Sequence, residues 1–206
     1  MRNFLFSIFL LGILSSCSSY KADFIPVQKN RETFTPDFLT EKNLEKVFKV
    51  DIEVYGHQLG GIMAVKKLAP EHYRIALLTE IGAKLLDFEL NKEEMKLNYA
   101  IEQLNRKIIL NILKQDFLIL LNENIDVEEQ YRYNDYTIYQ ASISGKKLYY
   151  FIIHDTLQLD KTVWASGQKE KTVFTYFYSD TDFPDIKIDH KNVKLTIELR
   201  VLENEE

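Results

Sequence analysis

Apolar and polar residues alternate strictly in two stretches of the chain, residues 47–55 and 193–202. Successive side chains of a strand point to opposite faces, so this period of two predicts strands with one buried and one polar face. Shorter runs between turn residues predict more strands. The predicted strands are residues 47–55, 62–68, 73–78, 84–90, 95–99, 133–143, 147–154, 157–165, 171–178, 186–189 and 193–202. About eleven strands on short turns favour a mainly β, antiparallel fold.

The period changes once, between the fifth and sixth predicted strands. Apolar residues across 101–121 recur at helical spacing, beside a polar stripe that includes Lys107 and Asn111. Lys114 and Asp116 fall in the most apolar part, which argues against a membrane-spanning helix. The pattern therefore predicts a β-rich α+β chain in which one helix packs against the sheet.

The amino terminus has the order of a secretory leader. Arg2 precedes an apolar stretch at residues 4–14 that is too short to span a bilayer comfortably. Leu14-Ser15-Ser16-Cys17 follows it and resembles the lipobox of bacterial lipoproteins, in which the cysteine is acylated. The alternative is an ordinary signal peptide with an incidental cysteine. Because Cys17 is the only cysteine, it has no partner for an internal disulfide, which favours lipid attachment.

This leader sets the expected organisation of the chain. Residues 1–16 are the signal peptide, residues 17–43 a lipid-anchored tether interrupted by Pro26 and Pro36, and residues 44–206 the folded domain. Loss of the leader removes one basic residue and leaves the chain mildly acidic. An acidic chain without a basic run argues against nucleic acid as a partner and against electrostatic docking on anionic lipid. The lipid on Cys17 is therefore expected to provide the membrane anchor.

The polar residues form no pattern typical of catalysis or of a metal site. The histidines at 57, 72, 154 and 190 are scattered, and His154-Asp155 has no serine in a nucleophile turn. Asp180, Asp182 and Asp185 could supply oxygen ligands to calcium, but their spacing lacks the glycine and terminal glutamate of a calcium loop. Gly60-Gly61 is too short a signal for a phosphate loop. We expect no enzyme, no cofactor and no metal.

Several predicted strands carry apolar side chains on both faces, as in Tyr149-Tyr150-Phe151. One face can be ordinary core. The second must cover the helix, line a cavity or meet a partner, unless the sheet is simply covered on both sides. The candidate lining residues of an apolar cavity are Leu86, Phe88, Phe151, Ile153, Phe174 and Tyr176. A register error of one residue would reverse the face of each.

The chain resembles the LolA/LolB superfamily, the periplasmic carrier and outer-membrane receptor of bacterial lipoprotein localisation. The likeness extends over most of residues 46–202 and is best in residues 73–90 (YRIALLTEIGAKLLDFEL). The helix after the fifth strand matches too, as do residues 173–178 (VFTYFY), residues 183–188 (FPDIKI) and the long final strand. A lipid-anchored chain is more similar to the receptor branch, because the carrier is soluble.

The resemblance implies an unclosed antiparallel half-barrel whose helix packs on the concave side, with an apolar cavity for acyl chains. Ile81, before Gly82, matches an exposed apolar residue that helps the receptor put its cargo into the membrane. The implied partners are a membrane, acyl chains of lipid or lipoprotein, and a periplasmic carrier protein, at the outer membrane of a Gram-negative bacterium. A non-enzymatic envelope protein with a filled core and a protein partner remains the alternative.

Overall fold

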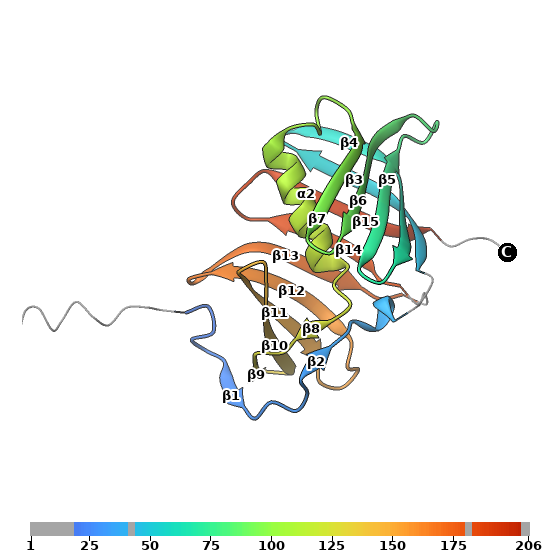
Figure 1. Cartoon of the computed structure of the whole chain (residues 1–206). Helices are drawn as coiled ribbons and strands as arrows, with labels where there is room; N and C mark the ends of the chain where they lie inside the picture. Colours follow the sequence, from blue (N-terminus) through green and yellow to red (C-terminus); the bar gives the residue numbers. More distant parts are fainter. Residues whose placement is uncertain (1–18, 41–43, 180–182, 203–206) are drawn as a thin grey trace, which may run out of the picture.

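The computed structural model describes residues 19–40, 44–179 and 183–202, and within them the fold is mainly β (Figure 1). Thirteen strands form one antiparallel sheet in the order β1-β9-β10-β11-β12-β13-β14-β15-β3-β4-β5-β6-β7, and β2 pairs with β8. The strands are β1 Ile25–Val27, β2 Thr33–Phe34, β3 Glu45–Val54, β4 His57–Ala69, β5 His72–Leu78, β6 Lys84–Asn91, β7 Glu94–Ala100, β8 Ile125–Asp126, β9 Glu129–Tyr133, β10 Tyr136–Ile143, β11 Lys146–Ile153, β12 Leu159–Ser166, β13 Lys169–Phe177, β14 Asp185–His190 and β15 Leu195–Leu202. Strands β1 and β7 are its two edges, so the predicted unclosed half-barrel is confirmed.

The first and last predicted strands pair at the middle of this sheet. β3 and β15 are antiparallel, with Val50 opposite Leu199 and Ile52 opposite Ile197. All four side chains are buried in the main core. The long-range pairing joins the two ends of the domain because each strand has a continuous apolar face to bury.

All eleven predicted strands occur, with changes at their ends. β4 begins at His57, five residues earlier than predicted, because the Gly60-Gly61 pair lies inside the strand and not before it. A Cβ at Gly61 would lie 2.1 Å from the carbonyl oxygen of Leu78 on β5. Glycine is required there by the close approach of a neighbouring strand and not by a turn.

The helix α2, Lys107–Leu120, packs between the two halves of the curved sheet (Figure 1). It begins six residues after the predicted start at residue 101. Ile101 still continues the ladder of β7, since its N–H donates to the Leu85 carbonyl, and Leu104 N–H then closes a turn onto Ile101. No helix of the described residues is long and apolar enough to cross a membrane.

The amino-terminal segment differs from the tether predicted for residues 17–43. From Ser19 on, its described part lies against the domain: β1 pairs with β9, and β2 pairs with β8. The 3-10 helix η1, Asp37–Leu39, buries Phe38 and Leu39 in the main core. These elements are two or three residues long, too short to produce a visible period. Pro26 is tolerated because β1 is an edge strand.

Candidate functional site

The concave face of the sheet is apolar and is covered by α2, which we call the cover helix. Four of the six residues predicted to line a cavity lie on this face: Leu86, Phe88, Phe174 and Tyr176. The ring of Phe88 packs against Phe117 of the cover helix, with 5.5 Å between the ring centroids. All four side chains are buried, so in this structure the predicted lining residues form part of a packed interior.

The assignment of Phe151 to the same lining is wrong. On β11 the side chains of Leu148, Tyr150 and Ile152 enter the main core, whereas Phe151 belongs to a second cluster on the opposite face. Strict alternation puts Ile153 on the side of Phe151. Tyr149-Tyr150-Phe151 is apolar on both faces, so its pattern did not distinguish the side of the helix from the other side.

The second cluster is covered by the amino-terminal segment. Phe24 packs edge-on against Phe151 at 5.9 Å and tilted against Tyr131 at 5.8 Å. The backbone N–H of Tyr20 donates to the carbonyl of Gly167 at 2.9 Å, and the Tyr20 hydroxyl donates to Glu170 at 2.8 Å. The segment that follows the predicted lipid attachment site is therefore fixed on the outer face of the sheet.

The ends of the cover helix are poorly stabilised. Its N-cap is Arg106, which makes no side-chain capping bond, and its first turn holds no acidic residue. Its last turn holds no basic residue. Caps and charges of these kinds normally satisfy the free backbone groups and the dipole of a helix. The cover helix therefore depends mainly on packing against the sheet for its stability.

One buried polar pair joins the cover helix to the sheet. His190 Nε2 lies 3.0 Å from Asp116 Oδ1, and His190 Nδ1 lies 3.1 Å from the carbonyl oxygen of Leu195. A carbonyl can only accept, so Nδ1 carries a proton. Burial lowers the pKa of His190, but the hydrogen bond and charge of Asp116 outweigh it and the net direction is upward. Burial also raises the pKa of Asp116, so both members of the pair bind a proton more readily than the free side chains do.

Two cavities border the cover helix. The first, which we call the α2 pocket, has a volume of about 200 Å³. It is lined by Ile108, Asn111, Ile112, Gln115, Asp116, Lys146, Trp164, Thr172, His190, Asn192 and Val193. The second, of about 280 Å³, lies at the other end of the helix beside Phe117, Leu121 and Glu123. Both are below the 300–1,000 Å³ or so of ordinary ligand sites. Neither is lined by Leu86, Phe88, Phe174 or Tyr176.

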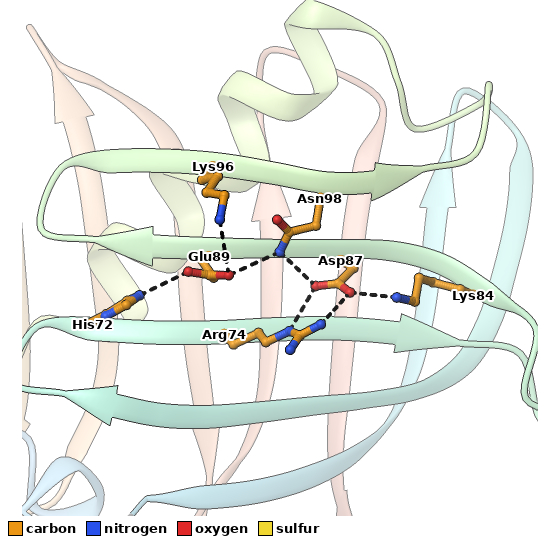
Figure 2. Close-up of polar contacts among 7 residues, drawn as sticks. All are labelled: His72, Arg74, Lys84, Asp87, Glu89, Lys96 and Asn98. Carbon is orange, nitrogen blue, oxygen red and sulfur yellow. Dashed lines mark hydrogen bonds and ion pairs between the residues drawn. The ribbon is translucent and has the colours of Figure 1, made fainter.

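A charged cluster, which the sequence analysis missed, covers the outer face of β5, β6 and β7 (Figure 2). Its centre is Asp87, which accepts hydrogen bonds from Arg74 Nη2 at 2.9 Å and Lys84 Nζ at 2.7 Å. The Arg74 bond is the main reason that the pKa of Asp87 lies well below its ordinary value. Glu89, bonded to His72 and Asn98, extends the cluster along β6. The alternating charged residues along β5, β6 and β7 were the sequence pattern from which this cluster could have been predicted.

Ile81 lies at the tip of the β5–β6 turn with 93% of its surface exposed. The turn is closed by Thr79, whose N–H donates to the carbonyl of Ala83 at 2.8 Å, and Gly82 has a φ of +85° that suits glycine. Glu80 beside it lies 3.7 Å from Lys49. The residue is thus presented to the surroundings by a well-defined turn.

Other predicted positions are separate or lie outside the described residues. Cys17, Asp180 and Asp182 are outside them. The described residues contain no group of three or more histidine, cysteine or acidic side chains able to hold a metal ion. His154 ends β11 in a turn, where its N–H donates to the Asp135 carbonyl.

Comparison with known proteins identifies the fold. The chain is similar to the crystal structure of a LolA superfamily protein from Nitrosomonas europaea, with a TM-score of 0.55 and 8% sequence identity over 80% of this chain and 86% of that one. A DUF1329 family protein from Desulfovibrio piger matches 80% of this chain and 85% of that one, at a TM-score of 0.44 and 8% identity. No family model matches the sequence. No curated protein matches it either. The chain therefore shares a LolA-like fold.

Proposed function

We propose that this chain is a lipid-anchored envelope protein that binds acyl chains of lipid or lipoprotein cargo between its concave sheet and the cover helix. The observation that carries the proposal is the apolar concave face of an unclosed sheet, covered among the described residues by one α-helix whose N-terminus lacks a side-chain capping bond. The LolA-like fold supports it. Cargo binding on this face requires the cover helix to move outward, since Phe88 and Phe117 are in contact.

The anchor is proposed to be lipid on Cys17, at the outer membrane of a Gram-negative bacterium. Ser19 is two residues from Cys17, so the acylated residue could lie at most about 7 Å from Ser19. Ser19 begins the segment in which Tyr20 and Phe24 pack on the outer face of β9–β11. The membrane would therefore be close to the domain, which gives Ile81 a function as a shallow membrane contact only if its turn faces the same bilayer.

Truncation of matched phenylalanines tests the cargo site. Phe88 and Phe151 are both buried, but they lie on opposite faces of the sheet. The full chain in detergent would be titrated with dansyl-labelled undecanoic acid. Phe88→Ala opens space beneath the cover helix and is expected to tighten binding, whereas Phe151→Ala is expected to leave the affinity unchanged. Equal affinities in the two variants and the parent would contradict binding on the concave face.

Replacement of Cys17 tests the anchor. Cys17→Ala is expected to abolish labelling by radioactive palmitate and to release the protein from the membrane fraction of cells. Ser19→Ala, outside the Leu14-Ser15-Ser16-Cys17 motif, is the control and should leave both unchanged. Continued membrane association and labelling of Cys17→Ala would show that the lipoprotein interpretation is wrong.

A non-enzymatic interaction protein with a filled core is the second candidate, and one observation favours it. Leu86, Phe88 and Phe174 are completely buried, and the two cavities beside the cover helix are small. In that case the titration above would show no saturable binding to the parent or to Phe88→Ala. The proposed ligand would then be a protein partner and not acyl chains.

A further inference from the structure

The α2 pocket brings together three residues from neighbouring strands under the cover helix. Thr172 on β13 is directly opposite Trp164 on β12 and directly opposite His190 on β14. Cross-strand partners share a face and have Cβ atoms about 4.5–5.5 Å apart. Asp116 of the cover helix completes the group through its 3.0 Å bond to His190. All four line the same cavity of about 200 Å³.

Two polar oxygens in this group have no hydrogen-bond partner among the described residues. They are Asp116 Oδ2 and Thr172 Oγ1, and both are screened from water. Buried oxygens without partners are rare in folded proteins, because each has lost its bonds to water and gained nothing in return. One oxygen is a carboxylate acceptor, and the other belongs to a hydroxyl that can donate.

We propose that the α2 pocket is a binding site for a neutral molecule with a hydroxyl group on an apolar body. The ligand hydroxyl donates its proton to Asp116 Oδ2 and accepts the proton of Thr172 Oγ1, so one group satisfies both oxygens. Ile112 and Val193 supply apolar walls for the body of the ligand. Ile108, exposed at the start of the cover helix, marks the outer rim.

The charges of the pocket exclude the other simple head groups. A carboxylate or phosphate has no proton to give Asp116 Oδ2 and would place two acceptors against each other. An ammonium would lie beside the cationic Lys146, which lines the pocket, and it has no lone pair to accept the proton of Thr172 Oγ1. Lys146 is already engaged, since its Nζ donates to Gln115 Oε1 at 2.6 Å and lies 5.2 Å from the Trp164 ring centre. A neutral hydroxyl meets none of these objections.

The site is distinct from the proposed acyl-chain space. None of the four concave-face residues Leu86, Phe88, Phe174 and Tyr176 lines it. Occupancy can be measured separately, because Trp164 is the only tryptophan of the chain and lies in the wall of the pocket. Its fluorescence reports on the surroundings of Trp164, which include the wall of this pocket.

The experiment is a titration of the full chain with 1-hexanol at pH 7, followed by Trp164 fluorescence. Hexanoate and hexylamine serve as probes of the same length with an anionic and a cationic head. We expect saturable binding of 1-hexanol and affinities for the two charged probes that are lower by about tenfold or more, the equivalent of one lost hydrogen bond.

Thr172→Val keeps the shape of the side chain and removes its hydroxyl, so it is expected to weaken 1-hexanol binding by about tenfold. Thr162→Val is the matched control: Thr162 is equally buried on β12, but its hydroxyl is bonded to Tyr176 at 3.2 Å and lies outside the pocket. It should bind 1-hexanol like the parent. The proposal is overturned by the absence of a saturable change, by unchanged affinity in a folded Thr172→Val protein, or by hexanoate binding as tightly as 1-hexanol.

Discussion

Asp87 and Asp116 are two buried carboxylates in opposite situations. Asp87, 1% exposed on the outer face of β6, receives bonds from Arg74, Lys84 and Asn98. Asp116, 2% exposed on the cover helix, shares one hydrogen bond with His190, and its second oxygen has no partner among the described residues. The pKa of Asp87 is lowered mainly by Arg74, whereas burial raises the pKa of Asp116.

The difference shows which of the two buried carboxylates has all of its hydrogen-bond partners. The side chains of Arg74 and Lys84 remain about half exposed, so water shares the task of stabilising the charged cluster around Asp87. His190 and Asp116 are both almost entirely enclosed. A satisfied cluster on an outer face is typical of a role in stability. A half-satisfied pair beside a cavity is typical of a site that binds something or moves.

The largest expected effect is on stability when either acid is truncated. Asp116→Ala leaves His190 buried without its partner and should lower the free energy of unfolding by about 3–5 kcal/mol. Asp87→Ala should cost less, about 1.5–3 kcal/mol, because Arg74 and Lys84 can turn to solvent. Urea denaturation followed by circular dichroism measures both. An equal loss in the two variants would remove the distinction between the sites.

The two sites should also respond to pH in opposite directions. The folded pKa of Asp87 lies below its ordinary 3.8, so its contribution is complete above about pH 4 and is lost as pH falls through the folded value. The folded pKa of His190 lies above 6.5, so its contribution is complete below pH 6.5 and is lost as pH rises through the folded value.

Neutral variants separate these two limbs of a pH–stability profile. Asp87→Asn is expected to reduce the loss of stability at acid pH and to leave the loss of stability at alkaline pH unchanged. Asp116→Asn is expected to reduce the loss of stability at alkaline pH and to leave the loss of stability at acid pH unchanged. An Asp116→Asn profile that is parallel to the parent above pH 7 would show that the pair with His190 is not responsible for the alkaline loss.

The buried threonines give a smaller effect of opposite sign. Thr172→Val replaces a hydroxyl that has no partner among the described residues and is expected to leave stability unchanged or raise it by up to about 1 kcal/mol. Thr162→Val removes the bond to Tyr176 and should lower stability by about 1 kcal/mol. Thermal unfolding of both variants beside the parent decides the sign. Destabilisation by Thr172→Val would mean that its hydroxyl is satisfied in solution.

The smallest expected effect on stability is at Ile81. Ile81→Glu should change the free energy of unfolding by less than about 0.5 kcal/mol, because the side chain contacts almost nothing. If the turn contacts a membrane, the substitution should slow transfer of a bound dansyl-labelled acid to lipid vesicles. Leu157→Glu, at another exposed turn, is the control. Equal transfer rates in both variants would show that Ile81 has no such function.

Local patterns determined most of the strands and the single helix. The alternation in residues 47–55 and 193–202 predicted β3 and β15 because each buries one continuous face. The same patterns missed β1, β2 and β8, which are two or three residues long, and β9, a five-residue strand whose Tyr131 and Tyr133 lie on one face. Segments that short gain their structure from the strand they pair with and not from their own sequence.

The candidate sites needed the tertiary structure. The sequence determined that the strands carry too much apolar surface for one face, and it identified Ile81 as an apolar residue in a turn. Only the folded sheet decided that Phe88 faces the cover helix and Phe151 faces the amino-terminal segment. Only the packing of the helix placed Asp116 against His190, 74 residues later. The physical reason is that local periodicity records burial, whereas the choice of face and of polar partner depends on register and on contacts between distant segments.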